Sequence, residues 1–223
     1  MTHPVTRPRL VRSPTTGMFA IAALCIATVI VLLVFAGSRT SAPSPDIWLA
    51  TWFADHRTDS EDAAGLLLAH VTTPLVLITG TIVVALVLWS RRWRAEAVVL
   101  TASVLIAYGI SGIMKVIVHR ARPMAPLNLS PESEGSFPSG HVIVVATLAL
   151  VALVIAWPRL SVVGRWIWTS TATIVIVAIC VDRLLVGAHW VTDVLASLSL
   201  AALIAVGAAY AIGRLRSPVG ERT

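Results

Sequence analysis

After Phe137-Pro138-Ser139-Gly140-His141, the chain continues as VIVVATLALVALVIAW (142–157), a run without a charged residue. An α-helix rises about 1.5 Å per residue, so about 20 apolar residues cross the hydrocarbon core of a bilayer, which is about 30 Å thick. The run therefore predicts a membrane-spanning helix, and it decides the fold class. The serine, glycine and histidine at its start need a separate explanation, because polar residues beside a membrane span are costly.

The composition of the whole chain is typical of a membrane protein. Of the 223 residues, 57% are hydrophobic and 13% are charged, whereas soluble domains are about half apolar and a quarter charged. The mean hydropathy is +0.86. Cys25 and Cys180 lie inside apolar runs, and we interpret them as packed core residues rather than a disulfide or a metal pair. No metal-binding spacing occurs in the sequence, so we predict no metal and no other cofactor.

Six apolar segments are long enough to span the membrane. Lipid offers no hydrogen-bond partners to the backbone, so each segment is predicted to be a helix, and the fold to be all-α. We expect one six-transmembrane-helix bundle over residues 17–213, in which Pro74 either kinks the second helix or marks its start. The first segment is too long for the apolar core of a signal peptide and is interpreted as an uncleaved span. The predicted spans are residues 17–36, 65–90, 96–118, 140–157, 162–181 and 190–212.

The basic residues predict the orientation. Most of the 17 Lys and Arg residues fall in the two tails (1–16 and 214–223) and in the loops after the second and fourth spans, including Arg91-Arg92-Trp93-Arg94. We expect the protein in the plasma membrane, and the positive-inside rule places both tails and these two loops on its cytoplasmic side. This asymmetry also explains the net charge of +6 without a nucleic-acid partner. Residues 46–62 are predicted to form a helix that lies on the membrane surface.

Three polar stretches are then expected together at the extracytoplasmic face: KVIVHRARP (115–123), FPSGH (137–141) and DRLLVGAHWVTD (182–193). They carry Lys115, Arg122 and Arg183. Arginine forks match phosphate oxygens, and lysine provides a point charge. This set of cations predicts an anion-binding site at the membrane surface.

The start of the fourth span can complete such a site. A helix N-terminus offers free N–H groups and the positive end of a dipole to an anion, and Gly140 lets an anion approach the backbone. Ser139 can cap the helix or donate its hydroxyl. His189 and Asp193 are four residues apart and share a helix face, so the carboxylate can fix the histidine tautomer while the other ring nitrogen attacks. His141 can protonate a leaving oxygen. The set predicts phosphoryl transfer.

Lys115-x6-Arg122-Pro123, Pro138-Ser139-Gly140-His141 and Arg183-x5-His189-x3-Asp193 resemble the three-part signature of the type 2 phosphatidic acid phosphatase (PAP2) family, whose superfamily includes the vanadium-dependent haloperoxidases. The resemblance implies that His189 is the nucleophile, Asp193 orients it, and His141 is general acid and then general base. It further implies metal-independent chemistry. Asp182 departs from the pattern, because the family usually has serine there. The phosphate-binding residues that the resemblance implies are Lys115, Arg122, Ser139, Gly140 and Arg183.

Several polar residues near these motifs fall outside the signature. His70 and His119 are interpreted as structural, and Arg120 as a solvated loop residue. Glu132 and Glu134 are also assigned to a solvated loop. Trp190 is expected to anchor its helix at the membrane interface.

The predicted function is metal-independent hydrolysis of a phosphomonoester or diphosphate on a lipid. Phosphatidic acid, phosphatidylglycerol phosphate and polyprenyl phosphates or diphosphates all fit as substrates, and the bilayer is the other partner. Two alternatives stay open: a phosphotransferase of the same superfamily, and a non-catalytic membrane protein that binds anionic lipids.

Overall fold

The computed structural model describes residues 16–37, 44–130 and 132–216, with the backbone alone for Pro74 and Leu75. The described part of the chain is helical without strands, which confirms the all-α prediction. The predicted tails at 1–16 and 214–223 lie largely outside it. The helices are α1 (Thr16–Gly37), α2 (Ser44–His56), α3 (Asp59–Val71), α4 (Pro74–Ser90), α5 (Arg94–Val118), α6 (Gly140–Ala156), the 3₁₀ turn η1 (Trp157–Arg159), α7 (Val162–Leu185) and α8 (Val191–Arg216).

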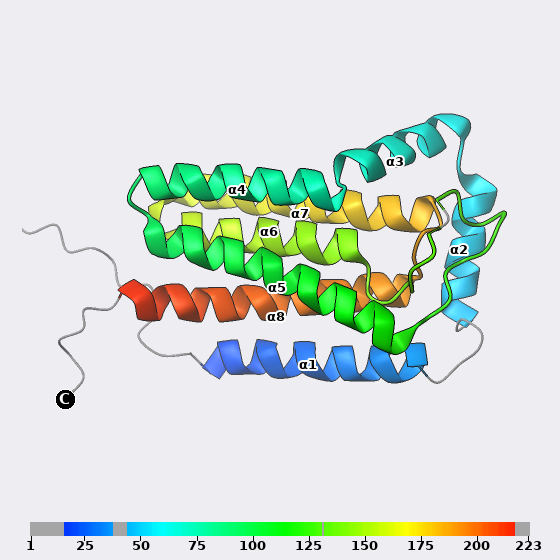
Figure 1. The fold of residues 1–223 in the computed structure, drawn as a ribbon, viewed down its shortest axis with the longest axis horizontal. Helices are drawn as coiled ribbons and strands as arrows, with labels where there is room; N and C mark the ends of the chain where they lie inside the picture. Colours follow the sequence, from blue (N-terminus) through cyan, green and yellow to red (C-terminus); the bar gives the residue numbers. More distant parts are fainter. Residues whose placement is uncertain (1–15, 38–43, 131, 217–223) are drawn as a thin grey trace, which may run out of the picture.

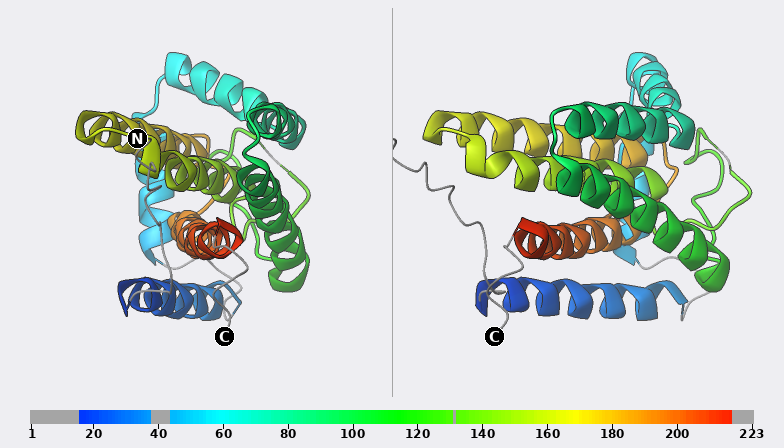
Figure 2. Two further views of the ribbon diagram at one scale, coloured as in Figure 1. Left: turned by 90° about the vertical axis from the view of Figure 1, so that its left-hand side faces the viewer. Right: turned by 60° about the vertical axis from the view of Figure 1, so that its left-hand side comes forward.

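The long helices run side by side along one axis (Figure 1). α6 packs against α4, α5, α7 and α8, and the side chains of Val142 to Thr147 in its first turns are buried. A helix that is apolar on all sides is stable in such an enclosed position, which explains the uninterrupted apolar run from Val142. α8 lies between α1 and the layer of α6 and α7 (Figure 2).

Among the described residues, five helices are long and apolar enough to cross a membrane: α1, α5, α6 with η1, α7 and α8. The segment predicted as one span at 65–90 is instead two helices, α3 and α4, which are bent by 51° at their junction. Thr73 is extended, with φ −58° and ψ 154°, and α4 begins at Pro74. Proline disfavours helical backbone in the residue before it and removes a hydrogen-bond donor. Of the two predicted effects of Pro74, a kink or a helix start, the structure has the start of α4.

The prediction of a single surface helix over residues 46–62 was wrong. α2 ends at His56, and Thr58 caps a second helix, α3, through a capping box with Glu61. α2 crosses the end of the bundle (Figure 1) and packs against α7 and α8. It buries Asp46, whose side chain reaches the start of α8.

The two ends of the bundle differ in their chemistry. At one end, Glu96 of α5 pairs with Arg159 at 3.0 Å and with Arg216, and so ties α5, η1 and α8 together. At the other end, the described parts of the α5–α6 loop (residues 119–130 and 132–139) and the α7–α8 turn (186–190) come together beside α2 (Figure 1). All three motifs of the sequence meet at this second end.

Candidate active site

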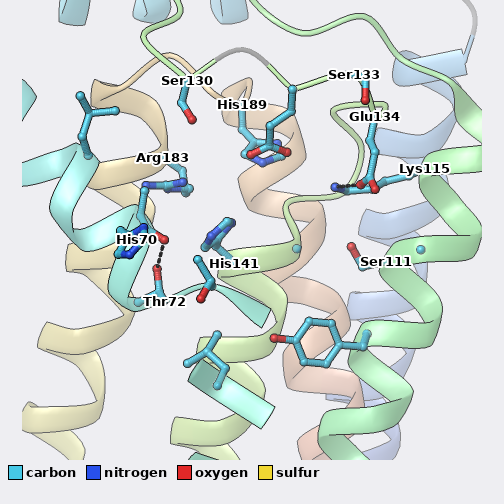
Figure 3. A pocket seen from close by; sticks show the side chains of 18 residues that line it. His70, Thr72, Ser111, Lys115, Ser130, Ser133, Glu134, His141, Arg183 and His189 are labelled. Atoms are coloured by element: carbon cyan, nitrogen blue, oxygen red, sulfur yellow. Dashed lines mark hydrogen bonds and ion pairs between the residues drawn. The ribbon is translucent and has the colours of Figure 1, made fainter. Parts of the chain in front are cut away.

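A pocket of about 830 Å³ opens among α3, α5, α6, α7 and the α5–α6 loop. Figure 3 shows its side chains converging from these elements. Five of the eight predicted site residues form part of its wall, namely Lys115, Gly140, His141, Arg183 and His189. The other three, Arg122, Ser139 and Asp193, are buried directly behind that wall.

Each of the two loop-side cations is held by a carboxylate. Lys115, in the last turn of α5, lies with its Nζ 2.7 Å from Glu134 Oε2. Arg122 donates from Nη2 to Glu132 Oε2 at 2.6 Å and from Nη1 to the Ala188 carbonyl at 2.8 Å. Glu132 and Glu134 were expected in a solvated loop, and both are exposed. They also line the pocket, as partners of these cations. An anionic ligand therefore has to compete with them.

The charges of this loop are set by their neighbours. The hydrogen bond from Lys115, helped by its charge, lowers the pKa of Glu134 below its ordinary value. Burial lowers the pKa of the Arg122 guanidinium, and the nearby carboxylates oppose that effect. Glu134 is therefore ionised at neutral pH, as a partner of Lys115 should be.

Arg183 is buried at the end of α7, with 1% of its surface exposed. Its Nε donates to the carboxylate of Asp182 at 2.6 Å, and its Nη2 forms an ion pair with the same oxygen. Asp182, at the position where the family signature usually has serine, thus pairs with Arg183, one of the residues predicted to bind phosphate. Asp182 Oδ1 has no hydrogen-bond partner among the described residues.

His189 is fixed by a main-chain group that the sequence did not reveal. Its Nδ1 lies 2.7 Å from the carbonyl oxygen of Ser136, and 3.7 Å from Asp193 Oδ2. A carbonyl only accepts, so Nδ1 carries the hydrogen, and the lone pair of the neutral ring is on Nε2. Arg122 Nη1 is 3.5 Å from that Nε2. Burial, together with the charge of Arg122, lowers the pKa of His189 although Asp193 opposes it, which favours the neutral, nucleophilic ring.

Asp193 and its surroundings correct two expectations. Arg120, expected in solvent, is buried and forms ion pairs with Asp193 and with Asp46 of α2. Trp190, expected at the membrane interface, is also buried, and its Nε1 donates to the Ala121 carbonyl at 2.8 Å. Both residues brace the turn that carries His189.

Ser139 and Gly140 lie at the N-terminus of α6, where the sequence predicted them. Ser139 is the N-cap, its Oγ accepts from Val142 N at 3.5 Å, and its own N–H donates to Ser197 Oγ at 2.8 Å. Ser139 is buried and does not line the pocket, and the contact that its hydroxyl makes here is the helix cap. Gly140 faces the pocket, where a β-carbon would lie 3.3 Å from Ser111 Oγ.

His141 follows in the first turn of α6 and projects into the pocket (Figure 3). Its ring is hydrogen-bonded to the backbone of Ala69 in α3. Beyond it the pocket continues along His70, Thr72 and Tyr108. His70, interpreted from the sequence as structural, is therefore part of the pocket wall.

Within residues 16–37, 44–130 and 132–216, no three His, Cys, Asp or Glu side chains are grouped as metal ligands. Cys25 is buried and Cys180 half-buried, and both thiols are free. The pocket wall bears two cations, Lys115 and Arg183, with Arg122 buried behind it. It also bears the neutral imidazole of His189, whose lone pair is on Nε2, and the second imidazole of His141. This combination suits transfer of a phosphoryl group, in which positioning and charge stabilisation provide most of the catalysis.

The chain is similar in sequence to proteins that are named as phosphatases of lipids. Undecaprenyl-diphosphatase of Sulfolobus acidocaldarius is 33% identical over 119 residues, which are 51% of this chain and 54% of the relative, so the chain spans about half of that protein. Phosphatidylglycerophosphatase B of Escherichia coli K12 is 26% identical over 213 residues, covering 71% of this chain and 81% of the relative.

The fold has a counterpart among solved structures. The transmembrane PAP2-type phosphatidylglycerolphosphate phosphatase from Bacillus subtilis matches with a TM-score of 0.73 at 19% identity, over 89% of this chain and 98% of that one. This likeness establishes the fold of a multi-pass membrane protein. A sequence model described as PAP2 superfamily matches residues 96–217, more than half of the chain, from α5 through all three motifs to the end of α8. The chain therefore belongs to the PAP2 superfamily.

Proposed function

We propose that this protein is a metal-independent lipid phosphatase that works through a phosphohistidine at His189. The observation that carries the proposal is the state of this ring. Ser136 and Asp193 occupy the Nδ1 side, and Nε2 faces Arg122 and a pocket wall that also bears Lys115 and Arg183. A neutral nucleophile beside three cations is what attack on a phosphate dianion requires.

In the first step, His189 Nε2 attacks the phosphorus and the bond from phosphorus to the lipid oxygen breaks. The proton that the leaving oxygen needs comes from His141, whose ring lines the same pocket. Arg122 and Arg183 stabilise the charge on the equatorial oxygens, and the negative charge of Asp193 stabilises the positive ring of the phosphohistidine.

In the second step, His141, now neutral, accepts a proton from a water molecule. The water oxygen forms a bond to phosphorus while the bond from Nε2 to phosphorus breaks. Inorganic phosphate leaves, and both histidines return to their initial state. Three protein cations provide the charge that a metal ion would otherwise supply, which is the reason for proposing a metal-independent reaction.

The pocket supports a lipid as substrate. Its volume of about 830 Å³ is that of a site for a sizeable organic ligand, much larger than a phosphate group needs. Besides the charged residues, its wall contains Leu66 of α3, Leu77 of α4 and the ring of Tyr108 of α5. We propose that the phosphate is bound at the cations and the chain leaves along this apolar wall. A polyprenyl diphosphate or phosphatidylglycerol phosphate is the proposed substrate, because the relatives named above are phosphatases of these lipids.

We further propose that the pocket faces away from the cytoplasm of a plasma-membrane protein. Arg91, Arg94, Arg165 and Arg214 belong to the opposite end of the bundle, and the positive-inside rule puts that end in the cytoplasm. A reporter fused at Thr223 should then report cytoplasm. A periplasmic signal would invert the orientation.

The decisive experiment is a phosphate-release panel with the purified, detergent-solubilised protein. The substrates are undecaprenyl diphosphate, phosphatidylglycerol phosphate and phosphatidic acid, each with and without EDTA and with and without an added alcohol. Phosphate release in EDTA that the His189→Ala variant lacks supports the proposal. No release from any lipid, or release that needs Mg²⁺, would contradict it. Phosphorylated alcohol as the main product would identify a phosphotransferase instead.

A further inference from the structure

A buried chain of three charges joins α2, the α5–α6 loop and α8 behind the pocket. Arg120 Nη2 is 2.7 Å from Asp46 Oδ2, and Arg120 Nη1 forms an ion pair with Asp193. Thr192 completes the contact, since its N–H donates to Asp46 Oδ1 at 3.0 Å and its Oγ1 to Asp46 Oδ2 at 2.7 Å. The side chains of Arg120, Asp46 and Asp193 are 6%, 0% and 0% exposed.

Neither Arg120 nor Asp46 lines the pocket, so neither has a place in the two steps proposed above. A buried ion pair is seldom more stable than well-packed apolar residues in the same place, so stability alone explains this arrangement poorly. A role in the site is the more economical explanation.

Arg120 controls both groups that face Nδ1 of His189. Its side chain holds the carboxylate of Asp193, whose Oδ2 also accepts from Trp190 N at 3.0 Å. Its main-chain carbonyl accepts from Ser136 N at 2.9 Å, and the carbonyl of that same Ser136 accepts from His189 Nδ1. The position of the ring therefore depends on Arg120 along two routes.

Asp46 decides the charge that the ring experiences. The charge of Arg120 cancels that of Asp193, so a pair of these two would offer no net charge to the imidazole. With Asp46 added, the three groups carry one net negative charge. In a buried site, where screening is weak, that charge stabilises the positive ring that forms when Nε2 bonds to phosphorus.

We propose that Arg120 and Asp46 are positioning residues for the nucleophile His189: Arg120 fixes the two groups that face its Nδ1, the Ser136 carbonyl and the Asp193 carboxylate, and Asp46 restores the negative charge that Arg120 would otherwise cancel. This inference rests on the proposed function, because it assigns the network to the phosphorylation of that histidine.

The test compares four variants with the wild type: Asp46→Asn, Arg120→Gln, the double variant, and Arg120→Lys. Asp55→Asn, an exposed acid on the same helix α2, is the matched control. Phosphate release gives kcat and KM, their pH profiles give the acid limb, and thermal unfolding gives the Tm. Other charged or titratable groups around the ring remain in every variant, and these are Asp193 on α8, Arg122 and Glu132 in the α5–α6 loop, Arg183 on α7 and His141 on α6.

Asp46→Asn should lower kcat about 10- to 100-fold, by analogy with the outer partners of metal-binding histidines, with little change in KM because the pocket wall is intact. Its acid limb should move to lower pH, since less negative charge favours the neutral ring. Arg120→Gln should move the limb to higher pH, because two carboxylates then remain. The double variant carries one net negative charge again, so its limb should return toward the wild type. Arg120→Lys should recover part of the activity of Arg120→Gln, and Asp55→Asn should match the wild type.

An unchanged kcat and acid limb in Asp46→Asn would overturn the inference. So would limb shifts of the same sign in both single variants, or losses of kcat that merely follow the Tm. Because the wild type is measured in the same assay, a failure of the proposed function can be told apart from a failure of the inference about Arg120 and Asp46. Wild-type turnover with an unaffected Asp46→Asn contradicts only the network, whereas a silent wild type contradicts the proposed function and this inference with it.

Discussion

His189 donates its Nδ1 hydrogen to the main-chain carbonyl of Ser136 across 2.7 Å, a shorter contact than the 3.7 Å to Asp193. Two groups therefore face Nδ1 of the proposed nucleophile: a carbonyl that is hydrogen-bonded to it, and a carboxylate that lies beyond hydrogen-bond distance and contributes its charge. One of them belongs to the backbone and is retained in any side-chain variant.

The Asp193→Asn variant tests how far the Ser136 carbonyl, without the carboxylate, keeps His189 in its tautomer. Where one carboxylate alone orients a catalytic histidine, the amide lowers kcat about 10⁴-fold. Here Ser136 keeps the hydrogen on Nδ1, so kcat should fall only about 10- to 100-fold, measured as lipid phosphate release at saturating substrate. Asparagine is chosen because Asp193→Ala would leave Arg120 buried without this partner, at a cost in stability of about 3–5 kcal/mol. A loss as large as that of His189→Ala would mean that Asp193 alone sets the tautomer.

Glu134→Gln should strengthen substrate binding. The carboxylate of Glu134 forms an ion pair with the ammonium group of Lys115, and a phosphate has to displace that carboxylate to bind there. Because the Glu134 side chain is 67% exposed, the pair is worth no more than about 1 kcal/mol, so KM should fall up to about fivefold with kcat nearly unchanged. The control is Asp55→Asn, which removes an exposed acid elsewhere. An increase in KM for Glu134→Gln would show that this carboxylate helps to bind the substrate.

The pH profile should reveal a neutral nucleophile in mild acid. Burial lowers the pKa of His189, so the ring becomes protonated only as the pH falls through a value below its ordinary 6.5. The acid limb of kcat/KM, which reports the free enzyme, should lie below that value, once the titration of the free substrate phosphate, followed by ³¹P NMR, has been divided out. A limb above 6.5 would mean that Asp193 outweighs burial.

Gly187→Ala should destabilise the whole site. Gly187 has a φ of +67°, and a β-carbon there would lie 1.9 Å from the Leu127 carbonyl oxygen. This close approach lets Leu129 N donate to the Val186 carbonyl at 2.9 Å, which joins the α5–α6 loop to the α7–α8 turn. The left-handed backbone alone costs about 1–2 kcal/mol for alanine, and the clash adds to it, so thermal unfolding should show a lower Tm. Gly207→Ala, at an open and exposed position in α8, should show no loss.

The sequence was sufficient to predict which side chains meet. His141, His189, Lys115 and Arg183 each stand where an apolar run ends or begins, and a helical bundle brings such ends to one face. The apolar runs themselves have the length of a bilayer, and they predicted six spans. Among the described residues five of these are long single helices, and the sixth, at 65–90, is the bent pair α3 and α4. Pro74 indicated the break between α3 and α4, although not the angle between them.

The groups behind the pocket could not be predicted, for physical reasons. The carbonyl of Ser136 has no signature in the sequence, because every residue has one. Arg120 was placed in solvent because a charged residue in a loop is usually exposed. Its burial depends on Asp46, more than 70 residues away in the chain, which reaches it only because α2 crosses the end of the bundle.

The most direct test of the account is chemical trapping of phosphate on His189. The His141→Ala variant lacks the proposed base for the second step, and a ³²P-labelled aryl phosphate with a good leaving group needs no acid in the first. We expect this variant to accumulate label that is stable to alkali, lost in acid and found on the peptide containing His189, and the additional change His189→Ala to abolish it. Full hydrolysis of lipid phosphate by the His189→Ala protein, or label on a different residue, would contradict the account.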